Sequence, residues 1–150
     1  MVGHSQSKRS CVKQTNDVYK YIHIFIRALG VLMRIMVVDD DAVTRNLFQN
    51  FMKSSGYEIH EAVNGSDALK KVDPHLDVIF LDWLMPIMSG LEFLEQFRVD
   101  KRMANVKVVM LTALSDIDNV VDAMDRGADD YIIKPFTKDV LMEKIGKLTV

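Results

Sequence analysis

The sequence predicts an α/β fold built on a doubly wound, five-stranded parallel sheet. Short apolar runs alternate with segments of helical period along residues 34–150. Three of these runs, residues 35–38, 77–81 and 107–111, are continuously apolar, which is typical of strands that helices cover on both faces. Right-handed crossovers between successive parallel strands then place helices on the two sides of the sheet.

Three aspartates separate the first predicted strand from the first predicted helix. The apolar run 35–38 stops at these aspartates, and residues 42–56 follow with apolar side chains at helical spacing. Asp41 is the predicted N-terminal cap, because a short acidic side chain accepts hydrogen bonds from the first free N–H groups of a helix. Gly56 is predicted to end this helix.

The second strand and helix lead to a buried central strand. Residues 57–62 alternate between apolar and polar side chains, which predicts a strand. A short helix is expected over residues 66–72, with Ser66 as its cap. Residues 77–81 form an apolar run that ends at Asp82.

The last three helices and two strands follow the same alternation. Residues 90–98 and 117–124 carry helical stripes on either side of the strand 107–111. The chain then continues with a strand over residues 131–133 and a final helix over residues 138–148.

Length and composition indicate one globular domain. The chain has 150 residues, of which 49% are hydrophobic and 27% are charged, so a disordered or fibrous chain is excluded. Cys11 is the only cysteine, which rules out an intrachain disulfide and a multi-cysteine zinc site. A cytoplasmic location is therefore the expectation.

The distribution of charge divides the chain near Met33. Residues 1–34 contain six basic residues and one acidic residue, a net charge of +5, whereas residues 35–150 contain 13 basic and 20 acidic residues, a net charge of −7. The overall charge of −2 argues against a nucleic-acid binder. We therefore divide the chain into an N-terminal extension, residues 1–33, and a domain, residues 34–150.

The N-terminal extension has two parts. Residues 1–17 are polar and predict a loose tail. Residues 18–33 are apolar but too short and too charged for a transmembrane span, since a span needs about 20 mostly apolar residues. One hypothesis is an extra helix or strand without chemistry, or an upstream extension of a reading frame that starts naturally at Met33. The other is an amphipathic segment that docks on a membrane surface or a partner.

Polar side chains gather where the predicted strands end. In an open α/β sheet, ligands bind at the carboxyl ends of the strands. The chain places there four acidic residues, a hydroxyl and an ammonium: Asp39, Asp40, Asp41, Asp82, Thr112 and Lys134. Clustered carboxylates repel one another, and a hard divalent cation such as Mg²⁺ relieves that repulsion.

The same site has the chemistry to hold a phosphoryl group. A carboxylate acts as a nucleophile when it forms an acyl phosphate, and Asp82 suits this role because it follows the central buried strand. The metal, the Lys134 ammonium and the Thr112 hydroxyl would then surround the phosphoryl oxygens. No glycine-rich nucleotide-binding loop is present in the sequence.

Residues 34–150 resemble the receiver domain of two-component response regulators. The resemblance rests on the motifs "VVDDDAVTRNLF", "IFLDWLMPIMSGLEFL", "VVMLTA" and "GADDYIIKPF", which occur in the family's order. Trp83, directly after the aspartate, and the short remainder after the last helix are similar to the single-domain chemotaxis-type (CheY-like) members. The resemblance implies a flavodoxin-like fold with strand order 2-1-3-4-5.

The resemblance also implies roles for single residues around the metal. Asp82 matches the phosphoacceptor, and Asp40 matches the direct acidic Mg²⁺ ligand. Asp39 beside it acts directly or through water, and the backbone carbonyl of Leu84 matches the third protein ligand.

Further matches concern the switch. Thr112 matches the hydroxyl that turns toward the phosphoryl group, and Ala113 matches the small residue that leaves room for an aromatic side chain. Tyr131 matches that aromatic side chain, although a half-buried strand aromatic is the ordinary alternative. Lys134 matches the salt-bridging lysine, and the bond from Lys134 to Pro135 is usually cis in the family.

The function implied is a phosphorylation-driven switch rather than an enzyme. A histidine kinase or phosphotransfer protein would phosphorylate Asp82, and the surface of the fourth helix, fifth strand and fifth helix of the domain would bind a downstream protein. The only reactions that the chain itself would catalyse are its own phosphorylation and its own slow dephosphorylation. The alternatives are a phosphorelay intermediate, a Mg²⁺-dependent aspartyl-phosphate phosphohydrolase and a pseudo-receiver that is not phosphorylated.

Two positions depart from the family pattern. Leu84 and Leu114 lie where many relatives carry polar or acidic residues, beside the path of the water that attacks the acyl phosphate. Apolar side chains do not orient water, so slow self-dephosphorylation is expected.

Asp129 and Asp130, in the "GADD" motif, are interpreted as solvated loop charges.

Overall fold

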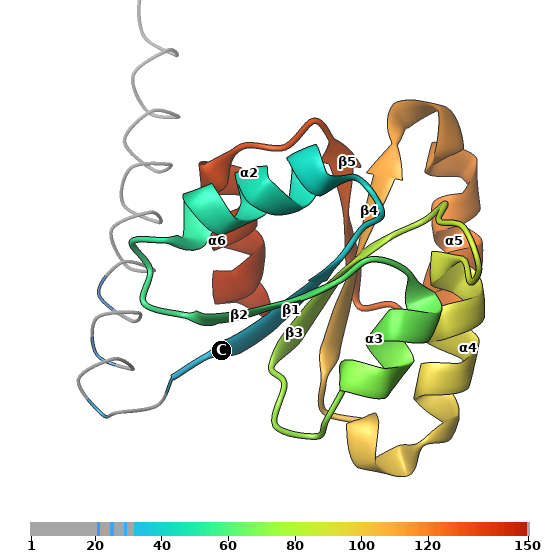
Figure 1. Cartoon of the computed structure of the whole chain (residues 1–150), viewed down its shortest axis with the longest axis horizontal. Coiled ribbons are helices and arrows are strands. Elements are labelled where there is room, and N and C mark those ends of the chain that lie inside the picture. Colours follow the sequence, from blue (N-terminus) through green and yellow to red (C-terminus); the bar gives the residue numbers. More distant parts are fainter. Residues whose placement is uncertain (1–20, 22–24, 26–28, 30–31, 150) are drawn as a thin grey trace, which may run out of the picture.

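The computed structural model describes residues 21, 25, 29 and 32–149, and within them five parallel strands form one sheet in the order β2-β1-β3-β4-β5 (Figure 1). This order and the parallel pairing confirm the predicted fold class. The strands are β1 (Arg34–Val38), β2 (Glu58–Ala62), β3 (Val78–Asp82), β4 (Lys107–Ala113) and β5 (Asp130–Lys134). The helices are α2 (Ala42–Met52), α3 (Gly65–Lys71), α4 (Gly90–Val99), α5 (Val120–Asp125) and α6 (Lys138–Leu148), with 3₁₀ helices η1 (Lys101–Met103) and η2 (Leu114–Asn119).

The helices cover both faces of the sheet, α2 and α6 on one side and α3, α4 and α5 on the other (Figure 1). Alternate side chains of the central strands β1, β3 and β4 are therefore buried against helices on opposite faces of the sheet. On one face, β1 and β3 residues such as Val37 and Phe80 pack with Phe48 of α2 and Leu141 of α6. On the other face, the alternate strand residues pack with α3, α4 and α5 side chains, among them Ala68, Phe93, Phe97 and Ala123.

Three predicted helix boundaries are wrong. The first helix ends at Met52 rather than Gly56, because both the N–H and the hydroxyl of Ser55 donate to the Met52 carbonyl and Gly56 reverses the chain with a φ of 77°. The second helix starts at Gly65, capped by Asn64, whose side chain accepts from the N–H of Asp67.

The third error concerns the start of the helix predicted for residues 117–124. It consists instead of the 3₁₀ helix η2, which already begins at Leu114, and the short helix α5. The predicted cap Asp41 is confirmed, since its carboxylate accepts from the N–H of Val43 at 3.0 Å.

Strand register brings the predicted site residues to one edge. Asp39 directly follows β1, whereas Asp82 and Lys134 are the last residues of β3 and β5. Thr112 is paired with Ile133, and Ala113 is paired with Lys134. Because all five strands run in the same direction, these residues meet at the carboxyl edge of the sheet.

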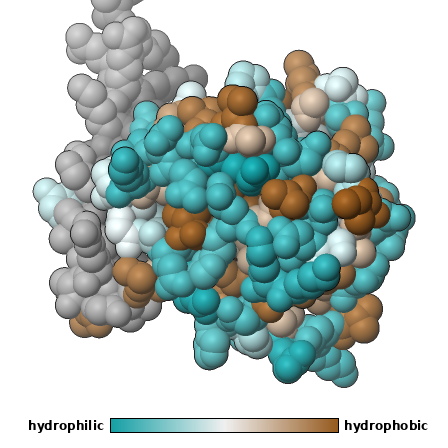
Figure 2. All heavy atoms as spheres, in the orientation of Figure 1, coloured by the Kyte–Doolittle hydropathy of each residue, from teal (hydrophilic) through white to brown (hydrophobic). Residues whose placement is uncertain are grey.

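The surface is mainly hydrophilic on the face shown in Figure 2, where apolar side chains form separate groups. Among the described residues, no helix is both long and apolar enough to span a membrane. The predictions of a loose tail for residues 1–17 and of one continuous apolar segment for residues 18–33 fall largely outside the described residues.

Candidate functional site

Three carboxylates converge at the carboxyl edge of the sheet. One side-chain oxygen from each of Asp39, Asp40 and Asp82 lies within 4.8 Å of the others. Asp39 is fully buried and Asp82 nearly so, while Asp40 is exposed at the rim. The cluster is thus open to solvent on one side and enclosed on the other.

Lys134 places its ammonium between the two buried carboxylates. Its Nζ donates to Asp39 at 2.7 Å and to Asp82 at 2.9 Å. The lysine comes from β5, whereas the aspartates come from β1 and β3, so the sheet topology alone brings the three groups together. One ammonium neutralises only part of the charge of three carboxylates, which leaves the cluster suited to a further cation.

The pKa of Asp82 is raised from an ordinary value of 3.8 to about 6, and burial is the largest cause. The neighbouring charges of Asp39 and Asp40 act in the same direction as burial, while the hydrogen bond and charge of Lys134 oppose the shift. For Lys134, burial acts to lower the pKa, but the hydrogen bonds and charges of Asp39 and Asp82 outweigh it and the pKa is raised. The lysine therefore stays charged at neutral pH.

Main-chain and arginine contacts fix the orientation of the buried carboxylates. The second oxygen of Asp39 accepts from the N–H of Asp41 at 2.9 Å, and the carbonyl oxygen of Asp39 accepts from the Arg45 guanidinium at 2.8 Å. The Lys134-bonded oxygen of Asp82 also accepts from the N–H of Trp83 at 3.0 Å. The role of Arg45 escaped the sequence analysis, because one arginine on a helical stripe gives no sign of which carbonyl it will reach.

Asp41 belongs to the helix cap rather than to the carboxylate cluster. Its side chain accepts from the N–H of Val43 and from the Thr44 hydroxyl at 2.9 Å. These bonds hold the pKa of Asp41 below its usual value, the largest contribution being the bond from Val43. Asp41 thus lies outside the carboxylate group formed by the other three acidic residues.

The switch residues predicted from the resemblance lie at the end of β4 and along β5. Thr112 is buried, and its hydroxyl donates to the Ala113 carbonyl at 3.2 Å. Tyr131 is on β5 with 36% of its surface exposed, and the Lys144 ammonium lies 5.6 Å from the centre of its ring. The Lys134–Pro135 peptide bond is cis.

The loop after Asp82 depends on a glycine that the sequence analysis did not single out. A Cβ atom on Gly90 would lie 2.1 Å from the carbonyl oxygen of Asp82, so only glycine fits there. The Gly90 N–H also donates to the Trp83 carbonyl at 2.9 Å, and Ser89 caps α4 with Glu92 in a capping box. The signal that the sequence offered for this turn was the pair Ser89 and Gly90 directly before a segment of helical period.

Two exposed leucines flank the site. Leu84, two residues after Asp82, exposes 65% of its surface, and Leu114, two residues after Thr112, exposes 67%. Neither side chain belongs to the core. The loop that carries Leu84 continues to Ile87, which has a φ of 72°.

The interpretation of Asp129 and Asp130 as solvated loop charges is wrong. The Asp129 carboxylate accepts from the Arg98 guanidinium at 2.9 Å and from the N–H of Val108 at 2.8 Å. Asp130 starts β5 and accepts from the Lys144 ammonium at 2.8 Å. Arg98 and Val108 lie 31 and 21 residues before Asp129, and Lys144 lies 14 residues after Asp130. The sequence next to the two aspartates therefore could not reveal these partners.

The donor set of the acidic cluster fits a hard divalent cation. It consists of carboxylate oxygens alone, without imidazole or thiolate, and one member is exposed where water can complete the coordination. Asp82 also offers a carboxylate that can act as a nucleophile toward phosphorus, beside the Lys134 ammonium, which can stabilise negative charge on phosphoryl oxygens.

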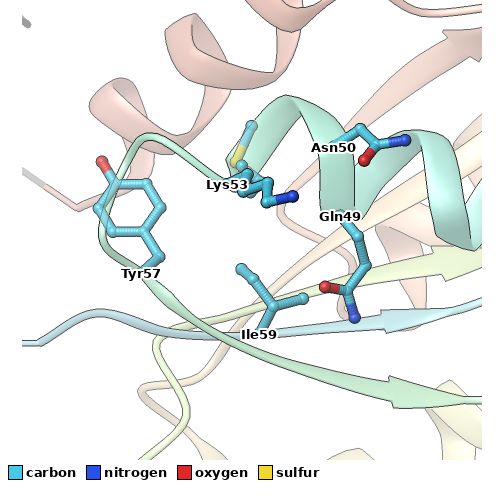
Figure 3. A pocket seen from close by; sticks show the side chains of 6 residues that line it. Gln49, Asn50, Lys53, Tyr57 and Ile59 are labelled. Atoms are coloured by element: carbon cyan, nitrogen blue, oxygen red, sulfur yellow. The ribbon is translucent and has the colours of Figure 1, made fainter.

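A hollow elsewhere on the domain is not part of this site. It has a volume of about 270 Å³ and lies between the end of α2 and the start of β2, lined by Gln49, Asn50, Met52, Lys53, Tyr57 and Ile59 (Figure 3). Ile59 pairs with Ile35 near the amino ends of the strands, which is the edge opposite the carboxylates. The hollow contains no convergent charges beyond Lys53.

Comparison of the sequence with known protein families gives a match over most of the domain. A family model described as the response regulator receiver domain matches residues 35–146. The chain is 37% identical over 116 residues to the chemotaxis protein CheY1 of Helicobacter pylori strain J99, an alignment covering 75% of this chain and 94% of that protein. It is 36% identical over 118 residues to the chemotaxis protein CheY of Pseudomonas aeruginosa, covering 77% and 95%.

Solved structures share the same architecture. The chemotaxis protein CheY4 of Vibrio cholerae superimposes with a TM-score of 0.73 at 27% identity, covering 78% of this chain and 98% of that one. A CheY-like receiver domain protein of Methanospirillum hungatei superimposes with a TM-score of 0.70 at 31% identity, covering 79% and 94%.

Proposed function

The chain belongs to the response regulator receiver domain family, as a CheY-like phosphorylation-activated regulator of two-component signalling, and we propose that Asp82 is its phosphoacceptor. The donor is a histidine kinase or a phosphotransfer protein, and the location is cytoplasmic. The observation that carries the proposal is the Lys134 ammonium bonded to both Asp39 and Asp82 inside a cluster of three carboxylates.

The transfer is a displacement at phosphorus. An Asp82 oxygen attacks the phosphorus of a phosphohistidine, the new oxygen–phosphorus bond forms, and the nitrogen–phosphorus bond breaks as the imidazole leaves. Lys134 lies where it can donate to the transferred phosphoryl group while Asp39 holds it in place. The cost of adding negative charge to an already acidic site is thereby reduced.

Mg²⁺ is the proposed cofactor. Asp39, Asp40 and Asp82 would hold it, with the carbonyl of Leu84 as the further ligand that the resemblance implies. When bound, the ion neutralises the charge of the carboxylates and of the phosphoryl oxygens. The all-oxygen donor set with one exposed member supports this choice over softer metals.

Phosphorylation is proposed to shift a two-state equilibrium of the surface. Thr112 would exchange its bond to the Ala113 carbonyl for one to the phosphoryl group, and Tyr131 would follow. The output surface is then formed by α5, β5 and α6, the fourth helix, fifth strand and fifth helix of the domain. A downstream protein, and no nucleic acid, binds there.

The chain is proposed to be a switch rather than an enzyme. A phosphohydrolase of this chemistry commonly needs an acid two residues after the nucleophile, and that position is Leu84. A pseudo-receiver is disfavoured because the carboxylates and Lys134 are all in place. A phosphorelay intermediate has the same site as a terminal switch, so the fate of the phosphoryl group distinguishes the two.

The experiment is phosphorylation with acetyl phosphate and Mg²⁺, followed by intact-mass measurement. Wild type and Asp118→Asn, a control in exposed η2, should each gain one phosphoryl group. Asp82→Asn should gain none. Equal labelling of Asp82→Asn and wild type would overturn the assignment.

A further inference from the structure

Lys144 of α6 holds its ammonium over the ring of Tyr131, and both residues bind the same carboxylate. The Lys144 Nζ lies 5.6 Å from the centre of the Tyr131 ring and donates to Asp130 Oδ1 at 2.8 Å. The backbone N–H of Tyr131 donates to that same oxygen, also at 2.8 Å. Asp130 therefore fixes the ammonium beside the residue whose ring it faces.

The sheet places this lysine and the switch hydroxyl on different sides of the ring. β5 is the last strand of the sheet, and α6 packs on the face that buries Ile132. Tyr131 belongs to the opposite face, because side chains alternate along a strand. Thr112 lies on that same opposite face, paired with Ile133, two residues after Tyr131. Lys144 thus reaches Tyr131 around the outer edge of the sheet, whereas Thr112 lies inward on β4.

The contact favours the exposed orientation of the ring. An ammonium within about 6 Å of the centre of an aromatic ring is attracted by the negative charge of the ring face, more strongly where water is partly excluded. The side chains of Lys144 and Asp130 each expose 25% of their surface, and Tyr131 exposes 36%. A ring that turned inward over β4 toward Thr112 would leave the ammonium and lose this attraction.

We propose that Lys144 is a positioning residue for Tyr131, and that its charge holds the ring in the exposed orientation and opposes activation. The inference rests on the proposed function, in which Tyr131 follows Thr112 when Asp82 is phosphorylated. Removal of the charge shifts the equilibrium toward the inward ring by about two- to fivefold, the effect of a cation–π contact between partly exposed groups. The active arrangement is then more populated at any degree of phosphorylation of Asp82.

The test measures the orientation of the Tyr131 ring by NMR of the full chain, isotope-labelled in its four tyrosines. Tyr131→Phe identifies the signal by its loss. Lys144→Met removes the charge and keeps a long apolar side chain, Lys144→Arg keeps the charge, and Lys147→Met is the control for loss of another α6 lysine. Each protein is measured with Mg²⁺, before and after addition of the phosphoryl analogue beryllofluoride. The fluorescence of Trp83 during the titration gives the affinity for the analogue.

We expect beryllofluoride to move the Tyr131 signal of wild type, and Lys144→Met to move it in the same direction without the analogue. Lys144→Met should also bind the analogue about two- to fivefold more tightly, because less free energy is needed to turn the ring inward. A general loss of positive charge would weaken the binding of an anion instead. Lys144→Arg and Lys147→Met should behave like wild type.

The proposal is overturned if the Tyr131 signal of Lys144→Met matches that of wild type before the analogue is added, or if Lys147→Met moves this signal equally. It is also overturned if Lys144→Met binds beryllofluoride no more tightly than wild type. Failure of the proposed function has a different signature, since Asp82→Asn would then respond to beryllofluoride like wild type. The signal of Lys144→Met without the analogue still decides in that case whether Lys144 positions the ring.

Discussion

The Lys134 ammonium lies 2.7 Å from a carboxylate oxygen of Asp39, a residue 95 positions earlier in the chain. Asp39 is fully buried, so this ion pair holds Lys134 in place independently of its second bond to Asp82. Lys134 therefore keeps a partner when the Asp82 carboxylate is neutralised or modified.

Asp82→Asn should stabilise the metal-free protein at pH 7. The pKa of Asp82 is about 6 in the folded protein, above its ordinary value of 3.8, so the folded state binds the proton more tightly than the unfolded state. Stability contributed by this group is present in acid and is lost as the pH rises from about 4 through 6. The variant removes that loss, and we expect a gain of about 1 to 3 kcal/mol at pH 7.

Urea unfolding in the presence of a chelator, at pH 7 and near pH 4, measures this effect. The gain should shrink toward pH 4, where the carboxyl group is protonated in the folded state and begins to be protonated in the unfolded state as well. Asp118→Asn serves as the control on an exposed carboxylate. A variant less stable than wild type at pH 7 would show that the Asp82 charge stabilises the fold.

Mg²⁺ binding should depend on Asp40 and not on Asp41. Asp40 belongs to the carboxylate cluster, whereas Asp41 is committed to the helix cap through Val43. Asp40→Asn should weaken binding by about tenfold or more, and Asp41→Asn should change it little because asparagine caps helices equally well. A Mg²⁺ titration followed by the fluorescence of Trp83, the only tryptophan, measures both. A larger loss in Asp41→Asn would mean that the acidic cluster is assigned one residue out of register.

The period of the apolar residues was sufficient to predict the sheet. The strands β1, β3 and β4 are buried on both faces, which is why their sequences are continuously apolar and were recognised. Helix ends were predicted less well, because they depend on single hydrogen bonds. The Ser55 bonds to Met52 stop α2 four residues before the glycine that a pattern would choose.

The site was predictable where strand ends determine it. Strand order and direction bring Asp39, Asp82 and Lys134 together, and each of them directly follows or ends an apolar run. Contacts from helices were not predictable: Arg45 reaches the Asp39 carbonyl, and Arg98 reaches Asp129 across 31 residues. Such contacts depend on how side chains pack in space, which a single sequence does not specify.

A chain beginning at Met33 should fold and accept a phosphoryl group like the full chain. Met33 is buried and its carbonyl accepts from the Glu58 N–H, whereas Tyr21, Phe25 and Leu29 lie exposed. The free energy of unfolding should change by less than about 1 kcal/mol. Urea unfolding and intact mass after acetyl phosphate treatment report the two properties. Loss of folding in the shortened chain would show that the preceding segment packs on the domain.

The last prediction concerns the lifetime of the acyl phosphate. Its hydrolysis requires a water in line with the bond between phosphorus and the Asp82 oxygen, and orienting that water accelerates the step. Leu84 and Leu114 are exposed beside the site but offer no hydrogen bond. We expect slow decay in wild type and decay faster by about tenfold in Leu84→Asn and Leu114→Glu. Loss of label over time measures it, with Val99→Asn as an exposed apolar control. If neither replacement accelerates decay, other groups set the rate and the two leucines belong to a partner-binding surface.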